Sequence, residues 1–274
     1  MSRIQLAALH VHPVKSVAGI APDEMAVEPW GPAGDRRWAV IDADHAVVTQ
    51  RQQPRLALAT AQPLGGGRIK VTGPGLDPLE IAVPEPTGTV PVEIFGKKIE
   101  AVAAATSAHD WFSEYLGARV RLVHLDAPEH RRQIDPRFSL PGETVSLADG
   151  FPLLVASISS LDSLNSLIAQ GDHAFEGPLP MNRFRPNVVV SGSGAWAEDE
   201  WRRISIGEIT FRVARTCGRC VVTTTDQHSA QRGKEPLRTL ARHRRIDGRL
   251  VFGQNLIPEH TGVLRLGDEV RVLQ

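Results

Sequence analysis

The chain has 274 residues, of which 42% are hydrophobic, and its 31 lysine and arginine residues equal its 31 acidic residues in number. This length allows one large domain or two small ones, and the apolar content excludes fibrous, collagenous and disordered proteins. Because the longest apolar stretches, such as 151–156, are too short to cross a bilayer and the N-terminus lacks the apolar core of a signal peptide, we expect a cytoplasmic protein without a membrane segment.

Short strands are predicted through the N-terminal half, because alternating apolar residues are interrupted by many of the 24 glycines and 20 prolines. One helix is predicted over 107–116, since it begins with a capping serine and stops at Gly117. Gly96 and Lys97 lie between two alternating runs and indicate a tight hairpin. The expected strands are 4–12, 38–42, 46–50, 68–72, 80–83, 89–94, 97–101 and 120–125.

The C-terminal half begins after a polar, proline-containing stretch, 126–143, in which no period is visible. We predict a loop there, with the domain boundary at its start. Serines 157, 159 and 160 cap a predicted helix over 161–169, and a second helix is predicted over 236–244. The expected strands are 187–191, 201–206, 209–214 and the β-branched run 221–225, with a terminal hairpin formed by 263–266 and 269–273.

These elements predict a mostly β (α+β) protein with a few helices, built from two linked β-rich units that are barrel-like. The predicted domains are 1–125 and 126–274.

Basic residues gather in one part of the chain. Eleven arginines and Lys234 lie between Arg202 and Arg249, where only four acidic residues occur. Arginine offers a planar fork of donors that suits phosphate and carboxylate groups, although a solvated surface explains an arginine excess equally well. The two cysteines of the chain lie inside this segment. We expect no nucleic-acid partner, because the segment lacks interleaved aromatic residues and the total charge is zero.

Cys217 and Cys220 have the spacing C-x-x-C. A thioredoxin-like redox pair needs the first cysteine at a helix N-terminus, but a β-branched run follows here. A zinc site needs four ligands, which His228 and His243 would have to complete. A third interpretation is one thiolate bound to a soft metal, with its pKa lowered by flanking arginines. From the spacing alone, two buried structural cysteines explain the pair as well as all three functional interpretations together.

Further donors suited to a phosphate occur outside the cysteine motif. Two arginines at positions i and i+2 share one side of an extended segment, a lysine and a serine share a loop, and an amide can both donate and accept. Each residue taken singly is best explained as a surface cation or a local salt bridge, so that only the set suggests a site. The set consists of Lys15, Ser16, Arg36, Arg183, Arg185 and Asn187.

Four stretches of the chain together resemble the MOSC superfamily, named for the C-terminal domain of molybdenum cofactor sulfurase. The first two resemble the β-barrel domain that precedes MOSC in one branch, and the last two resemble MOSC itself. Within the superfamily, the chain is similar to the mitochondrial amidoxime-reducing components and to bacterial reductases of N-hydroxylated compounds. The stretches are HVHPVKSVAGI (10–20), GDRRWAVID (34–42), NRFRPNVVVSG (182–192) and TCGRCVVTTTDQ with RGKEPLRTLARHR and FGQNL (216–256).

The resemblance implies a molybdenum cofactor, in which one pyranopterin dithiolene holds the metal and Cys220 is the protein ligand, whereas Cys217 does not coordinate. Asp226 is expected to orient the site or relay a proton to the leaving water, or else to be a turn carboxylate. Ile158 and Asn255 differ from the residues expected in the mitochondrial relatives, which affects the expected shape of the substrate pocket. The implied cofactor contacts are Lys15, Ser16, Arg36, Ser157, Ser159, Arg183, Arg185, Asn187, Arg219 and Asn255.

The implied activity is reduction of N-hydroxylated substrates, with the oxygen released as water. Since no ferredoxin-like domain is expected after residue 274 and two cysteines cannot hold a plant-type cluster, we expect a separate electron-donor protein or reductant. We also expect the protein to be a monomer. Two alternatives remain: a molybdenum cofactor carrier without turnover, and a sulfur-transfer protein with a persulfide on Cys220. Pyridoxal phosphate binding is a further family-level expectation, although the sequence shows no pyridoxal-phosphate domain.

Overall fold

Strands from both ends of the chain form the largest sheet of the computed structural model, which describes residues 3–274. β18 lies next to the start of β1, where Gln5 and Glu269 form a bridge and Val270 N donates to Ile4 O at 2.9 Å, so that the sheet nearly closes into a barrel. The strands, in order, are β1 (Gln5–Leu9), β12 (Val188–Ser191), β11 (Leu153–Ser157), β16 (Arg249–Pro258), β14 (Ile209–Gly218), β13 (Arg203–Ile206) and β18 (Val270–Val272), with β15 (Arg245–Ile246) beside β16.

The barrel is held together by apolar side chains that the strands turn inward. Leu6, Val190, Phe211 and Leu256 come from four different strands and are at most 1% exposed. Burial of such side chains is the dominant favourable contribution to folding, at about 1.5–3 kcal/mol each. The expected barrel-like C-terminal unit is therefore confirmed.

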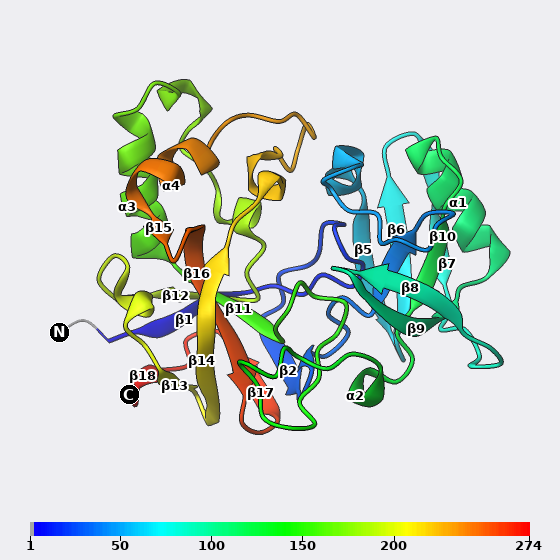
Figure 1. The fold of residues 1–274 in the computed structure, drawn as a ribbon, viewed down its shortest axis with the longest axis horizontal. Helices are drawn as coiled ribbons and strands as arrows, with labels where there is room; N and C mark the ends of the chain where they lie inside the picture. The colour runs from blue at the N-terminus through cyan, green and yellow to red at the C-terminus, as the bar shows by residue number, and fades with distance from the viewer. Residues whose placement is uncertain (1–2) are drawn as a thin grey trace.

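The N-terminal strands belong partly to this C-terminal half. β2 (Glu24–Glu28) pairs with β17 (Gly262–Arg265) on one side and with β3 (Gly31–Pro32) on the other. In Figure 1, the blue strands β1 and β2 accordingly lie among green and red ones. The domain boundary at residue 125 stays a prediction, and residues 1 and 2 of the first predicted domain lie outside the described part of the chain.

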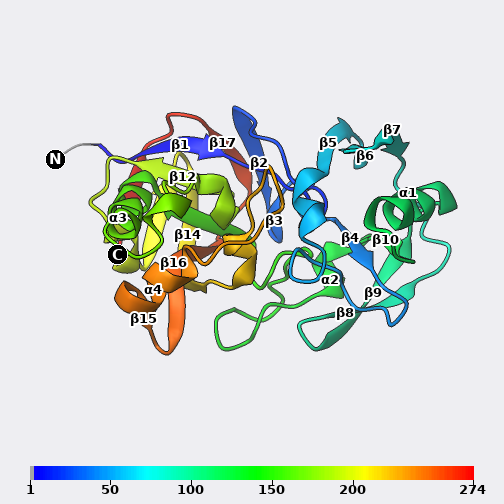
Figure 2. The ribbon, with the colours of Figure 1, turned by 90° about the horizontal axis from the view of Figure 1, so that it is seen from above.

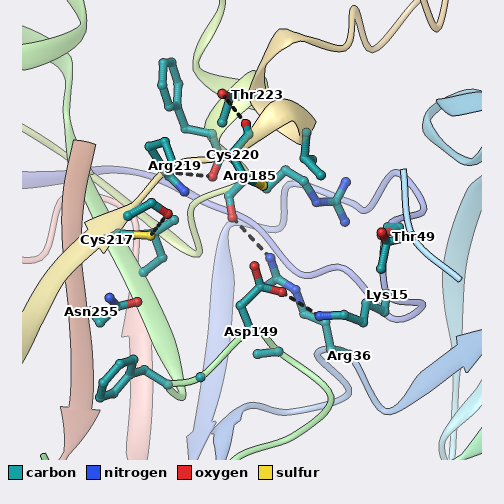
Figure 3. A pocket seen from close by; sticks show the side chains of 18 of the residues that line it. Lys15, Arg36, Thr49, Asp149, Arg185, Cys217, Arg219, Cys220, Thr223 and Asn255 are labelled. Carbon is teal, nitrogen blue, oxygen red and sulfur yellow. Dashed lines mark hydrogen bonds and ion pairs between the residues drawn. The ribbon is translucent and has the colours of Figure 1, made fainter. Parts of the chain in front are cut away.

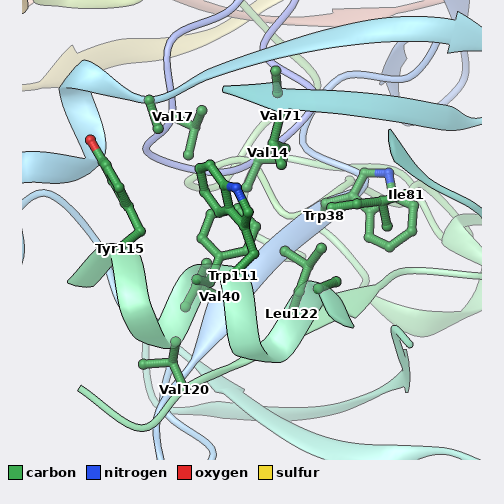
Figure 4. Close-up of a cluster of buried hydrophobic side chains, with 14 of the residues drawn as sticks. Val14, Val17, Trp38, Val40, Val71, Ile81, Trp111, Tyr115, Val120 and Leu122 are labelled. Atoms are coloured by element: carbon green, nitrogen blue, oxygen red, sulfur yellow. The ribbon is translucent and has the colours of Figure 1, made fainter. Parts of the chain in front are cut away.

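The rest of the N-terminal half contains two small sheets and one helix. The helix α1 (Thr106–Leu116) buries Trp111, Phe112 and Tyr115 against the sheets and ends at Gly117, whose φ of 63° suits a left-handed cap. Figure 4 shows this apolar cluster. The sheets have the orders β4 (Trp38–Ile41), β10 (Arg121–His124), β9 (Lys97–Ala103), β8 (Val90–Ile94), and β5 (Thr60–Gly65), β6 (Arg68–Gly73), β7 (Leu76–Ile81).

The remaining helices lie mostly on the C-terminal half. α3 (Ile158–Ala169) and α4 (Leu237–His243) cover one side of the barrel, as Figures 1 and 2 show. Within residues 3–274, no helix combines the length and apolar character needed to cross a bilayer. The short helices are α2 (Pro128–Arg131), η1 (Pro54–Leu58), η2 (Ala174–Glu176), η3 (Met181–Phe184), η4 (Ala197–Asp199) and η5 (Val221–Thr224).

The strand predicted over 221–225 is wrong, because this run forms the 3₁₀ helix η5. Thr223 Oγ1 donates to Cys220 O at 2.9 Å, and Thr224 Oγ1 donates to Val221 O at 2.8 Å. Hydroxyl bonds to the nearby backbone compete with strand pairing, and here they outweigh the β preference of the side chains.

Three further strand predictions need correction. The terminal hairpin is wrong, since β17 and β18 pair with β2 and β13 instead of with each other. Residues 46–50 form no strand, and only Ala46 and Val47 among them take part in isolated bridges. The hairpin turn lies one residue earlier than predicted, at Phe95 and Gly96, because Ile94 pairs with Lys97.

Candidate active site

A cleft opens where the loops of the N-terminal half meet the barrel, with about 800 Å³ of empty space including its open mouth. It collects residues from distant parts of the chain, as Figure 3 shows. The predicted site residues that line it are Lys15, Ser16, Arg36, Arg183, Arg185, Asn187, Arg219, Cys220 and Asn255.

Cys220 follows β14 at the start of η5 and is a half-buried free thiol. Its carbonyl accepts bonds from both the backbone and the hydroxyl of Thr223, which fixes the backbone beside the thiol. Arg51 Nη2 donates to Cys220 Sγ at 3.2 Å. This bond places a guanidinium group in direct contact with the thiol.

Cys217 lies in β14 and also lines the cleft. Burial raises the pKa of the Cys217 thiol, and the opposing effect of Arg219 is smaller, so this thiol stays protonated at neutral pH. A thioredoxin-like pair is contradicted, because Cys217 lies within a strand. Among the described residues, no three His, Cys, Asp or Glu side chains gather as a metal site, which contradicts the zinc interpretation.

Three cleft residues hold left-handed backbone: Ser16, Arg36 and Arg185 have φ values of 68°, 46° and 52°. Non-glycine residues in this region are strained, and such strain concentrates at functional sites. Arg36 Nη2 donates to Arg185 O at 3.1 Å, and Arg185 Nη2 donates to Val17 O at 2.7 Å. These bonds hold two guanidinium groups at one end of the cleft.

The cations of the cleft crowd one another. Burial, followed by repulsion from Arg36, lowers the pKa of Arg185 to about 9. The Nε atoms of Arg183 and Arg219 are buried without a hydrogen-bond partner in the described residues. Closely packed cations with unsatisfied donors are stabilised by a bound anion.

Lys15 joins the two walls of the cleft. Its Nζ donates to Asp149 Oδ1 at 2.6 Å and to Leu147 O at 2.9 Å. Burial lowers the pKa of Lys15 to about 8, and Asp149 only partly opposes this. The Asp149 side chain faces the open cleft and is 72% exposed. Surrounding protein atoms would raise the pKa of Asp149, but Lys15 and Arg51 hold it well below its usual range.

Two of the predicted contacts have their amides engaged with the backbone. Asn187 Oδ1 accepts from Leu154 N at 3.2 Å, and its Nδ2 donates to His10 O at 3.1 Å. Asn255 Nδ2 donates to Arg215 O at 3.1 Å. Both side chains therefore fix the walls of the cleft in addition to lining it.

Three predicted site residues are not brought to the cleft. Ser157 Oγ bonds Ser193 Oγ at 2.9 Å, and Ser159 Oγ donates to Ser193 O at 2.8 Å. Asp226 reaches the cleft only through Arg183, whose Nη2 lies 2.9 Å from Asp226 Oδ2. These positions correct the placement expected for the three residues.

Sequence reasoning missed several lining residues, of which Arg51 is the most important. Arg51 follows a threonine and a glutamine in a polar segment without any period, and nothing local relates it to a cysteine 169 positions later. The missed set includes Thr49, Arg51, Asp149, Phe151, Phe184 and Thr223.

Comparison with family models and with known proteins finds similarity over most of the chain. Residues 3–119 match the model of the MOSC N-terminal beta barrel domain, and residues 142–271 match that of the MOSC domain. Mitochondrial amidoxime-reducing component 1 of Xenopus laevis is 31% identical over 282 residues, which cover 96% of this chain and 80% of that protein. The Homo sapiens protein of the same name is 30% identical, and the match covers 98% of this chain and 82% of that protein.

A third relative is the molybdenum cofactor sulfurase of Oryza sativa subsp. japonica, which is 30% identical over 92% of this chain but only 32% of its own length. The chain therefore belongs to the MOSC family, with a MOSC N-terminal β-barrel domain followed by a MOSC domain.

Proposed function

We propose that this protein is a molybdenum-dependent oxidoreductase that reduces N-hydroxylated compounds. The observation that carries the proposal is the position of the Cys220 thiol, which lines a cationic cleft and accepts a bond from Arg51. The names of the amidoxime-reducing relatives support the reaction class.

The residues of the cleft fit a molybdenum cofactor. A thiolate is a suitable ligand for a soft metal centre, and Cys220 offers one. The anionic dithiolene and terminal phosphate of the cofactor match the arginine forks and Lys15, including the unsatisfied Nε of Arg219. When bound, the cofactor would supply two-electron redox chemistry at the metal.

The residues of the chain would bind and orient the cofactor. Cys220 would hold the metal, Arg51 would stabilise negative charge on the sulfur, and Lys15, Arg36 and Arg185 would hold the phosphate. Cleavage of an N–OH bond consumes two electrons and two protons and releases the reduced nitrogen compound and water. The electrons would come from a separate donor protein or reductant, and the enzyme would act as a cytoplasmic monomer.

Metal and pterin analysis of the purified protein, combined with a hydroxylamine reduction assay, tests the proposal. We expect stoichiometric molybdenum and activity in the wild type and in the matched control Cys217→Ala, and loss of both in Cys220→Ala. Arg51→Ala should lower kcat/KM about 10- to 100-fold, because a hydrogen bond to a charged group contributes about 1.5–3 kcal/mol. Wild-type protein without molybdenum, or an active Cys220→Ala variant, would defeat it.

The same samples address the two alternatives. Stoichiometric cofactor without activity under any chemical reductant would favour a carrier. The name of the sulfurase relative motivates the second alternative, transfer of a persulfide on Cys220. A sulfur adduct on Cys220 after incubation with a cysteine desulfurase, detected by mass spectrometry, would favour it.

A further inference from the structure

Phe95 occupies the tip of the β8–β9 hairpin in a conformation that a phenylalanine rarely adopts. Phe95 and Gly96 have φ values of 51° and 74°, which is the pattern of a two-residue turn that favours Asn-Gly. A bulky residue at such a position is strained, and the fold alone gives no reason for it. We therefore look for a functional role of the Phe95 ring.

The hairpin places the Phe95 ring at the cations of the cleft. Lys15 Nζ lies 5.2 Å and Arg51 Cζ 5.5 Å from the ring centroid. Because Arg51 Nη2 also contacts Cys220 Sγ at 3.2 Å, a single side chain separates the ring from the sulfur. The ring is nevertheless exposed, since 53% of Phe95 is accessible to solvent.

Backbone hydrogen bonds anchor the hairpin close to its tip. Val47 N donates to Glu93 O at 3.0 Å, and Glu93 N donates to His45 O at 2.8 Å, which ties β8 to the neighbouring loop. In Figure 1, the arrowhead of β8 points from the N-terminal half toward the centre of the molecule. The anchored hairpin therefore places one exposed aromatic ring beside the polar cleft.

On the basis of the proposed function, we infer that Phe95 determines substrate specificity by packing against an aryl group attached to the N–OH nitrogen. An exposed ring with one side on two cations and another open to solvent can stack on a planar aromatic group, whereas a small alkyl group gains little from it. N-hydroxylated arylamines are thus preferred over N-hydroxylated alkylamines.

The test compares N-phenylhydroxylamine with N-methylhydroxylamine as substrates of the molybdenum-loaded protein. Phe95→Asn removes the ring but suits the left-handed turn, so the fold and the molybdenum content should be kept. We expect KM for the phenyl compound to rise about three- to tenfold, while kcat and both constants for the methyl compound change less than about twofold. Phe95→Tyr keeps an aromatic ring and should therefore keep the preference for the phenyl compound.

Phe175→Asn is a matched control, because Phe175 is 81% exposed and its ring contacts His173 instead of the cations of the cleft. The inference would be overturned if Phe95→Asn raised KM equally for both compounds or lost molybdenum. It would also be overturned if Phe175→Asn raised KM for the phenyl compound as much as Phe95→Asn does. Calorimetry measures the affinity of the loaded protein for the two compounds without requiring turnover, so that this test is separate from the test of the proposed function. If the wild type reduces neither compound, the proposed function fails, and a phenyl affinity unchanged by Phe95→Asn would still overturn the role of Phe95.

Discussion

Lys15 makes anion binding in the cleft depend on pH, because burial lowers its pKa to about 8. As the pH rises above 8, the ammonium group loses its proton and one cation disappears from the cleft. We expect cofactor retention, measured as molybdenum content after dialysis between pH 7 and pH 9, to fall above pH 8. Lys15→Arg should reduce this fall and leave the part due to Arg185, whose pKa is about 9, and identical curves for the two proteins would contradict the assignment.

The stability of the cofactor-free protein should change in the opposite direction. The pKa of Lys15 is lower in the folded state than the ordinary value of 10.5 that applies to the unfolded chain. Between pH 8 and pH 10.5, the unfolded chain therefore binds more protons at this residue, and its contribution to the free energy of unfolding rises with pH. Urea unfolding of wild type and Lys15→Met across this range measures the difference.

Asp226 affects the cleft through its ion pair with Arg183. Burial would raise its pKa, but the amides of Ser229 and His228 and the charge of Arg183 lower it overall. A proton relay needs a pKa near the working pH, so we expect Asp226→Asn to leave the shape of the kcat pH profile unchanged. The variant should lose about 1–3 kcal/mol of stability, measured by thermal unfolding. A profile that loses one limb would restore the relay hypothesis.

At the scale of elements, the segment 226–235 ties the barrel to the loop that carries Arg51. Arg232 Nη2 donates to Arg51 O at 2.7 Å, and the side-chain amides of Gln227 and Gln50 pair at 3.2 Å. The position of Arg51 therefore depends on a segment 181 residues away.

We expect Arg232→Ala to lower molybdenum retention on dialysis and to lower stability by about 1.5–3 kcal/mol, since bonds from a charged donor are lost. Arg238→Ala is the matched control: Arg238 pairs with Asp172 at an exposed site, and such pairs contribute about 0–1 kcal/mol. Equal metal retention in both variants would show that the segment does not position Arg51.

At the scale of the whole molecule, the two ends of the chain complete one barrel. β1 pairs with β12 along four positions and meets β18 through the bridge between Gln5 and Glu269. Without β1, both β12 and β18 would expose unpaired edges. The N-terminal strand is thus part of the framework that carries Cys220.

We therefore expect residues 126–274 produced alone to unfold without a cooperative transition, as measured by circular dichroism. As a control, the full chain cut at Leu140, which is 60% exposed in a loop, should stay associated on gel filtration and unfold cooperatively. Cooperative unfolding of the isolated fragment would instead support an independent domain that begins at residue 126.

The sequence predicted those features that depend on neighbours along the chain. The helix over 107–116 was predictable because its apolar face and terminal glycine are local, although the expected serine cap is wrong, since the helix starts at Thr106 with Ala105 as its N-cap residue. β12 and β14 were predictable from β-branched runs. The four stretches that resemble the MOSC family also identified nine residues that line the cleft.

The tertiary structure decided what depends on partners distant in sequence. Arg51 contacts Cys220, which lies 169 positions later in the chain. β17 and β18 pair with β2 and β13 instead of with each other. η5 forms where local propensity favours a strand. Periodicity reports which face of an element is apolar, but not which element covers it. That choice follows from the packing of the complete barrel, so the sequence alone determined the residue types of the site, and only the folded chain determined their contacts.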